Sequence, residues 1–295
     1  MDKVNAVFDF LPVRVKEYLY DNSEFKRMYK GSKLNEIRLR VNTPLSFILE
    51  GDELIIKDLI IGAEDIEQCI QFITNYSLYA YENQIGQGFV TLKGGHRAGI
   101  TGQAILEGKN IVNQKNIAFV NIRVAHEIIG CANEVVEYMK ETMENTLIIA
   151  PPGCGKTTLL RDLIRQLSEG CMGRGYKIGL VDERSEIAAC FEGIPQNNVG
   201  IRTDVLDQAP KSEGMMLLLR SMSPEIICVD ELAGKADADA VKYIFGCGCK
   251  VIATVHGLSL EQVKRQPFIG ELIGEFGFRN IITLSRGMIK SMERV

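Results

Sequence analysis

The sequence predicts an α/β protein of two domains, a smaller α+β domain at residues 1–130 and an α/β domain at residues 131–295. Three observations lead to this prediction. A chain of 295 residues is long enough for two hydrophobic cores. Short strand patterns separated by glycines dominate the first part. In the second part apolar strand patterns alternate with helix patterns, which is typical of a sheet covered by helices on both faces.

The first elements expected along the chain are an interrupted helix and two strands. Residues 4–19 carry apolar side chains at helical spacing, and Pro12 interrupts the pattern, so we expect the helix to end there and restart. Apolar and polar residues alternate over 36–42, and an apolar run follows Pro44 over 45–49. These two patterns predict short strands.

The remainder of the first domain is predicted to complete a small sheet. A helix fits residues 64–76, because its isoleucines share one face. Three strand patterns follow and are separated by glycine turns, at 89–92, 97–106 and 117–124. The domain boundary is expected at 128–133, where a helical pattern returns.

Residues 146–162 are predicted to form a strand, a glycine-rich loop and a helix. Glycines let backbone N–H groups converge on phosphate oxygens, a lysine reaches the β- and γ-phosphates, and the threonine after it is a magnesium ligand. This is a Walker A loop in which Ala150 stands where the strict pattern has glycine. The residues expected to hold the nucleotide are Pro152, Gly153, Cys154, Gly155, Lys156, Thr157 and Thr158.

The other strands and helices of the second domain alternate along the chain. Strand patterns occupy residues 177–182, 199–203, 225–230, 250–255 and 281–284, and the clearest helix patterns occupy 211–222 and 237–245. In open α/β sheets, ligands bind at the carboxyl ends of the strands. Side chains at these strand ends are therefore candidates for the site.

The strand pattern 225–230 ends in two neighbouring carboxylates, Asp230 and Glu231. Acids at the end of a buried strand are costly unless they serve a function. In a P-loop enzyme Asp230 and Thr157 hold Mg²⁺, and Glu231 orients and deprotonates the attacking water. The pair therefore predicts Mg²⁺-dependent ATP hydrolysis. The sequence lacks both the Leu-Ser-Gly-Gly-Gln stretch of ABC-type ATPases and the Asn-Lys-x-Asp guanine-binding motif of GTPases.

Two further strand ends supply candidate catalytic residues. Asp182, Glu183 and Glu186 follow the preceding buried strand pattern, where they either position a water molecule or form a solvated acidic turn. His256 follows another strand and can donate a hydrogen bond to the γ-phosphate, although a histidine in a loop often has no such role. We therefore add Glu183 and His256 to Glu231 as candidate catalytic residues.

The order of these motifs resembles that of the type II secretion and type IV pilus-retraction ATPases. The shared features are the Walker A loop, the acidic stretch 182–186, Arg220 ahead of the Asp230–Glu231 strand, and a Thr-Val-His sequence ending at His256. Over nearly its whole length the chain more closely resembles the stage III sporulation protein AA family of endospore-forming bacteria. That resemblance is carried by segments 36–45, 202–206, 211–215, 219–225 and 229–232.

The resemblance implies a RecA-like P-loop ATPase with several finer properties. The secretion ATPases have Gly-Glu where this chain has Asp230-Glu231, so the catalytic role falls on Glu231. Those relatives also bring arginines of the N-terminal domain onto the phosphates, and Arg97 and Arg123 occupy comparable places. The family implies a hexameric ring in the mother-cell cytoplasm. It would be peripheral to the outer forespore membrane and would drive membrane-embedded sporulation channel proteins.

Composition restricts the alternatives. The net charge of −4 and the pI of about 5.6 argue against bulk electrostatic binding of nucleic acid. No apolar run of about eighteen residues and no signal-peptide layout is present, so direct membrane insertion is not expected. The eight cysteines are scattered, as in a reduced cytosolic protein.

Two alternative functions remain, a nucleic-acid remodelling ATPase and a nucleotide-gated structural scaffold. A phosphate-release assay separates the scaffold from an enzyme.

Overall fold

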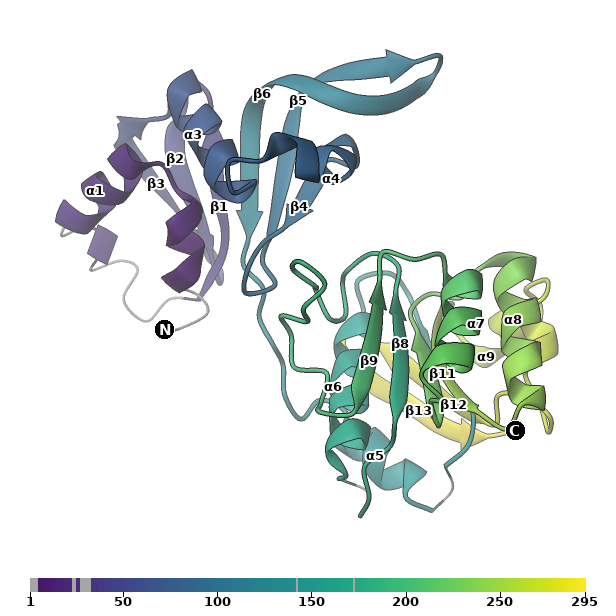
Figure 1. The fold of residues 1–295 in the computed structure, drawn as a ribbon. Helices are drawn as coiled ribbons and strands as arrows, with labels where there is room; N and C mark the ends of the chain where they lie inside the picture. Colours follow the sequence, from purple (N-terminus) through teal and green to yellow (C-terminus); the bar gives the residue numbers. More distant parts are fainter. Residues whose placement is uncertain (1–4, 23–24, 27–32, 142, 172) are drawn as a thin grey trace. The chain divides into compact units, whose positions relative to one another are not determined.

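The computed structural model describes residues 5–22, 25–26, 33–141, 143–171 and 173–295. It divides the chain into two compact units, Met1–His126 and Glu127–Val295. The division lies just before the segment 128–133 in which the sequence analysis expects it. Residue 4, where the first expected helix begins, lies outside the described residues. Figure 1 labels helices and strands of both units.

In its described residues the first unit forms a six-stranded antiparallel sheet with the strand order β3-β2-β1-β6-β5-β4 (Figure 1). The strands are β1 (Leu34–Arg40), β2 (Pro44–Leu49), β3 (Asp52–Ile60), β4 (Phe89–Thr91), β5 (Arg97–Glu107) and β6 (Asn110–Arg123). Strand β3 was not predicted from the sequence, because exposed charged residues such as Lys57 and Asp58 interrupt its apolar pattern. Strand β6 is longer than predicted, because its first residues are mostly exposed and show no apolar pattern.

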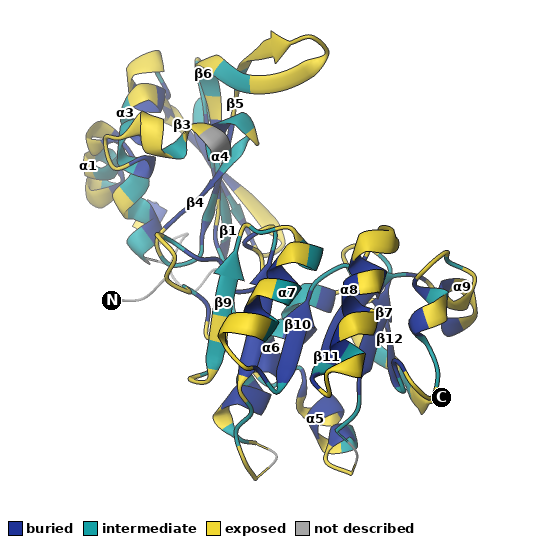
Figure 2. Cartoon of the chain, turned by 45° about the vertical axis from the view of Figure 1, so that its right-hand side comes forward, coloured by how far each residue is buried: buried dark blue, intermediate teal, exposed yellow. Residues whose placement is uncertain are grey.

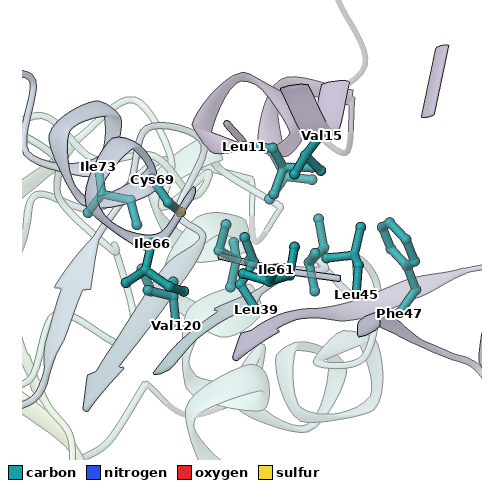
Figure 3. Close-up of a cluster of buried hydrophobic side chains, with 14 of the residues drawn as sticks. Leu11, Val15, Leu39, Leu45, Phe47, Ile61, Ile66, Cys69, Ile73 and Val120 are labelled. Carbon is teal, nitrogen blue, oxygen red and sulfur yellow. The ribbon is translucent and has the colours of Figure 1, made fainter. Parts of the chain in front are cut away.

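Helices cover one face of this sheet. They are the 3₁₀ helix η1 (Asn5–Phe10), α1 (Val13–Asp21), α3 (Ala63–Ile73), the 3₁₀ helix η2 (Leu78–Tyr81) and α4 (Glu82–Gly86). The expected interruption at Pro12 is confirmed, although the segment before it is a 3₁₀ helix. Figure 3 shows Leu11 and Val15 on the helix side of the core, above Leu39 and Leu45 of the sheet, and all four are fully buried.

The second unit forms a seven-stranded sheet in its described residues, with the order β13-β12-β7-β11-β10-β8-β9. The strands are β7 (Thr146–Ala150), β8 (Ile178–Asp182), β9 (Thr203–Asp207), β10 (Ile226–Val229), β11 (Lys250–His256), β12 (Asn280–Ser285) and β13 (Met288–Arg294). Only the β12–β13 pair among them is antiparallel. Strand β13 was not predicted from the sequence, because this edge strand is largely exposed and lacks an apolar run.

Helices pack on both faces of this sheet, as expected (Figures 1 and 2). On one face lie α5 (Asn133–Met139) and α6 (Lys156–Glu169). On the other lie α7 (Lys211–Ser221), α8 (Gly234–Gly246), α9 (Leu260–Lys264) and the 3₁₀ helix η3 (Gly270–Leu272). Strand residues alternate between the two cores, so the buried strands in Figure 2 are flanked by helices with exposed outer faces. No helix in the described part of the chain is both long and apolar enough to cross a bilayer.

The strand predicted at 199–203 is wrong, because β9 begins only at Thr203. Gly200 has a φ of 86°, and its N–H donates to the Asn198 side chain at 2.9 Å, which forms a turn there. The N–H of Arg202 donates to the Ser168 hydroxyl at 2.7 Å instead of to a neighbouring strand. Pairing with β8 therefore begins at Thr203, opposite Ile178.

A buried carboxylate connects two helices of the first unit. Asp65 in the first turn of α3 accepts hydrogen bonds from the Arg14 guanidinium of α1 and, at 2.7 Å, from the Gly62 N–H. Burial alone would raise the pKa of Asp65, but these hydrogen bonds outweigh it, so the pKa lies below its ordinary value. A lowered carboxyl pKa contributes stability above the unfolded-state pKa and loses it as the pH falls through the folded-state pKa.

Replacing Asp65 should therefore destabilise the first unit in a pH-dependent way. For Asp65→Asn we expect the free energy of unfolding to fall by about 1 to 2 kcal/mol near neutral pH, because a hydrogen bond to a charged group is worth about 1.5 to 3 kcal/mol and the exposure of Arg14 weakens it. In thermal unfolding, the stability difference between the variant and the wild type should become smaller as the pH falls well below the ordinary aspartate pKa of about 3.9. Asp58→Asn, at an exposed site of the same unit, is the control. A loss that does not depend on pH would contradict the ion-pair explanation.

Candidate functional site

The order of the parallel strands brings three chain segments together at one edge of the sheet. Strand β11 lies between β7 and β10, and all three are parallel. The glycine-rich loop follows Ala150 at the end of β7, Asp230 follows β10, and His256 ends β11. This edge is where open α/β sheets bind their ligands.

The loop before α6 has the backbone conformation that phosphate binding requires. Gly153 and Gly155 have φ values of 72° and 80°, in the left-handed region that favours glycine. A Cβ built at Gly153 meets nothing within 4 Å, so the loop is open to a ligand on that side. Helix α6 begins directly after Gly155, and its first N–H groups and positive dipole end favour an anion at this position.

Lys156 is largely buried and makes several hydrogen bonds in this structure. Its Nζ donates to the carbonyl oxygens of Ala150 at 3.1 Å and Pro151 at 3.3 Å and to Nδ1 of His256 at 2.8 Å. Burial lowers the pKa of Lys156, while the carboxylates of Asp230 and Glu231 act in the opposite direction. The ammonium group is thus held at the inner side of the loop, between the strand ends.

The residues predicted to hold Mg²⁺ lie together. Thr157 donates a hydrogen bond of 2.7 Å from its hydroxyl to Oδ2 of Asp230. A hydroxyl and a carboxylate are the oxygen ligands that Mg²⁺ prefers, and phosphates and water complete its coordination. In the described residues no group of three or more histidine, cysteine or acidic side chains is placed to hold a metal by itself. The hydroxyl of Thr157 and the carboxylate of Asp230 would supply two oxygen ligands to a Mg²⁺ ion.

The carboxylate of Glu231 contacts a histidine and an arginine. One carboxylate oxygen is 3.1 Å from Nε2 of His256, and the other is 3.3 Å from the guanidinium of Arg184. Because Lys156 can only donate, Nδ1 of His256 accepts its hydrogen bond, and Nε2 carries the proton and donates to Glu231. A continuous chain thus runs from Lys156 through His256 to Glu231.

Thr254 is a site residue that the sequence analysis did not single out. It is fully buried in β11, and its hydroxyl donates to Oδ1 of Asp230 and accepts the Glu231 N–H at 2.8 Å. Its place in the Thr-Val-His sequence was the available signal. The sequence did not show that β11 lies beside β10, and that placement is what brings the hydroxyl to the carboxylates.

Two carboxylates of the acidic stretch 182–186 are held by contacts within the protein. Asp182 is buried and accepts three backbone N–H groups, from Glu186, Ile187 and Ala188, at 2.8 to 3.0 Å. Burial raises the pKa of Asp182 despite these hydrogen bonds. Glu183 forms an ion pair with Lys211 of α7. This ion pair directs Glu183 toward α7, so its catalytic role stays a prediction.

The two predicted arginines face each other on neighbouring strands of the first unit. Arg97 begins β5 and is paired in register with Arg123, the last residue of β6. The Arg97 guanidinium stacks on the ring of Phe89 at 3.6 Å from its centroid, which gives that side chain a defined direction. Arg123 is exposed. Their predicted catalytic role also stays a prediction.

Comparison with solved structures identifies the fold. The ATPase DotB of Legionella pneumophila superposes with a TM-score of 0.59 at 16% identity, covering 92% of this chain and 76% of DotB. The pilus retraction motor PilT with bound ADP superposes with a TM-score of 0.59 at 15% identity, covering 88% of this chain and 75% of PilT. The predicted fold, a P-loop ATPase-like α/β domain preceded by a smaller domain, is confirmed.

Comparison of sequences identifies the family. Stage III sporulation protein AA of Bacillus subtilis (strain 168) is 39% identical over 285 residues, which cover 96% of this chain and 91% of that protein. The uncharacterized protein ycf45 of Porphyra purpurea is 24% identical over 277 residues, covering 92% of this chain but 44% of that protein. The family described as sporulation stage III, protein AA, matches residues 1–291. With this match and the close bacterial relative, the chain belongs to the stage III sporulation protein AA family.

Proposed function

We propose that this protein hydrolyses ATP in a Mg²⁺-dependent reaction, and that hydrolysis drives a sporulation channel or export apparatus between mother cell and forespore. The observation that carries the proposal is the convergence of Lys156, Thr157, Asp230 and Glu231 at one edge of the sheet. The shared fold with DotB and PilT supports it, as does membership in a sporulation family.

Nucleotide binding would rearrange the contacts of Lys156. A bound phosphate competes with His256 and two carbonyl oxygens for the ammonium group, because those three acceptors already use its donors. Charge favours the phosphate, since hydrogen bonds between ionised groups are about twice as strong as neutral ones. Release of His256 would free its Nδ1 and loosen its contact with Glu231. His256 would then report phosphate occupancy to the catalytic carboxylate.

The hydrolysis step would use Glu231 as the general base. The carboxylate accepts a proton from a water molecule while the water oxygen attacks the γ-phosphorus. The bond to the bridging oxygen breaks, and ADP leaves with that oxygen. Thr157 and Asp230 would hold the Mg²⁺ that offsets negative charge on the phosphates. Arg184 lies 3.3 Å from Glu231 and would help to orient the carboxylate.

Assembly would complete the site in this proposal. An arginine supplied from outside the P-loop domain stabilises the charge that develops on the phosphates and accelerates such reactions by about 10³ to 10⁵. Arg97 and Arg123 are the candidates, and a hexameric ring would deliver one of them from the first unit of the same or a neighbouring chain. The ring would sit in the mother cell at the outer forespore membrane, held there by embedded partner proteins.

Lys156→Ala tests the phosphate site. Loss of the ammonium group removes hydrogen bonds to charged oxygens, so ATP affinity should fall about 10- to 100-fold. Isothermal titration with ATP and Mg²⁺ measures the affinity, and the melting temperature checks that the variant is folded. Lys235→Ala, at an exposed lysine of α8, should bind as the wild type does. Wild-type affinity in folded Lys156→Ala would refute the assignment of the loop.

Glu231→Gln tests the catalytic base. The amide cannot accept the water proton, so turnover should fall about 10² to 10⁴-fold. ATP and Mg²⁺ should still bind, because Lys156 and Thr157 are intact. Phosphate release under saturating ATP gives the turnover number, with Glu271→Gln on the exposed Lys242 ion pair as the matched control. Full activity in Glu231→Gln would mean that Glu183 or Glu186 acts as the base instead.

The arginine proposal is tested by Arg97→Ala and Arg123→Ala. We expect both variants to bind ATP within about tenfold of wild type and at least one to lose most of its turnover. The wild-type specific activity should also fall on dilution as a ring dissociates. Arg38→Ala is the control, since Arg38 lies in the same sheet and is already paired with Glu36 at 2.7 Å. Two fully active variants, with wild-type activity unchanged in monomeric protein, would exclude the ring mechanism.

A further inference from the structure

The buried hydroxyl of Thr254 joins the two carboxylate residues of the site. It donates a hydrogen bond to Oδ1 of Asp230, while Oδ2 of the same carboxylate accepts from Thr157 at 2.7 Å. The same hydroxyl accepts the Glu231 N–H at 2.8 Å. Because Thr254 has no exposed surface, its hydroxyl is reserved for these protein partners.

The surroundings of Thr254 show why a hydroxyl is unusual at this position. The residues of β11 between Lys250 and His256 are otherwise apolar, as expected for a central strand between β7 and β10. A buried hydroxyl is costly unless it is hydrogen-bonded, and valine has almost the same shape without that cost. The hydroxyl of Thr254 both donates and accepts, and both its partners belong to the segment Asp230–Glu231.

The backbone at Glu231 is held by hydrogen bonds to Thr254. Glu231 has a φ of 55°, a left-handed conformation that is uncommon for a non-glycine residue. Two hydrogen bonds connect this turn to Thr254. The Glu231 N–H donates to the hydroxyl at 2.8 Å, and the Leu232 N–H donates to the Thr254 carbonyl oxygen at 2.8 Å.

The two bonds differ in what they require of residue 254. The bond from Leu232 is a backbone contact that any residue at this position would keep. The bond from Glu231 depends on the hydroxyl. The side chain of Thr254 therefore distinguishes this position from an ordinary strand residue, because it acts on the carboxylate of Asp230 and on the backbone of Glu231 together.

We propose that Thr254 is a positioning residue of the ATPase site, whose hydroxyl orients the Mg²⁺-holding carboxylate of Asp230 and fixes the backbone from which Glu231 projects. This inference rests on the proposed function. Two hydroxyl donors, one on each oxygen, set the plane of the Asp230 carboxylate before a nucleotide binds. Groups that orient a metal ligand typically change metal affinity or activity about 10- to 100-fold when they are removed.

Thr254→Val tests the inference, because it removes the hydroxyl and keeps the shape. We expect kcat to fall about 10- to 100-fold and the Mg²⁺ concentration needed for half-maximal ADP binding to rise over a similar range. The affinity for ADP without Mg²⁺ should stay at the wild-type value, since Lys156 and the loop are untouched. Titration of a fluorescent ADP analogue, with and without Mg²⁺, measures the binding independently of turnover.

Rescue and control variants separate positioning from general packing. Thr254→Ser restores the hydroxyl and should recover most of both losses. Thr146→Val makes the same change at the start of β7, where the hydroxyl donates to the Glu144 carbonyl oxygen at 2.9 Å, and should leave kcat and the Mg²⁺ response unchanged. If Thr254→Val does not fold, Thr254→Ala removes the hydroxyl without adding apolar volume and takes its place.

The outcomes are distinct. Unchanged kcat and Mg²⁺ response in a folded hydroxyl-free variant would overturn the inference, as would an equal loss of ADP affinity without Mg²⁺ or an equal effect of Thr146→Val. A wild-type protein that binds nucleotide with Mg²⁺ but releases no phosphate would refute the proposed ATPase function. In that case the Mg²⁺-dependent binding of ADP would still decide the role of Thr254.

Discussion

The site depends on the parallel register of three adjacent strands. Because β7, β11 and β10 run in the same direction, their carboxyl ends meet at one edge of the sheet, and each end supplies a different chemical group. The glycine loop supplies backbone N–H groups and Lys156, β11 supplies Thr254 and His256, and β10 leads into Asp230 and Glu231. Apolar cores pack against both faces of the sheet and stabilise this register. Because these cores are closely packed, the polar groups at the edge are held in fixed positions.

The polar groups at this edge satisfy one another. Lys156 contacts His256, His256 contacts Glu231, and Thr157 contacts Asp230, so these donors and acceptors are paired with one another. A nucleotide would have to exchange these contacts for contacts with phosphate and Mg²⁺. That exchange offers a physical link between nucleotide occupancy and the position of the Glu231 carboxylate, because the same side chains take part in both arrangements.

The first unit has a hydrophobic core of its own, formed between its antiparallel sheet and helices that include α1 and α3. The arginines proposed for catalysis lie outside that core at strand ends, where Arg97 and Arg123 face each other across β5 and β6. Each arginine already has a neighbour in this sheet, because Arg97 stacks on Phe89 and Arg123 lies opposite Glu36 of β1. The proposed delivery of an arginine to a polyphosphate would have to compete with these neighbours.

The sequence alone determined the two-part α/β organisation, the strand, loop and helix around Lys156, and the pair Asp230–Glu231, because local patterns carry these features. Prediction from the sequence failed where the local pattern is weak or where the structure depends on distant parts of the chain. The edge strand β13 lacks an apolar run, and the turn at Gly200 moved the start of β9 to Thr203. Only the tertiary structure showed that β11 lies between β7 and β10, since strand order is a matter of long-range pairing. That order alone brings Thr254 and His256 to the carboxylates and the lysine.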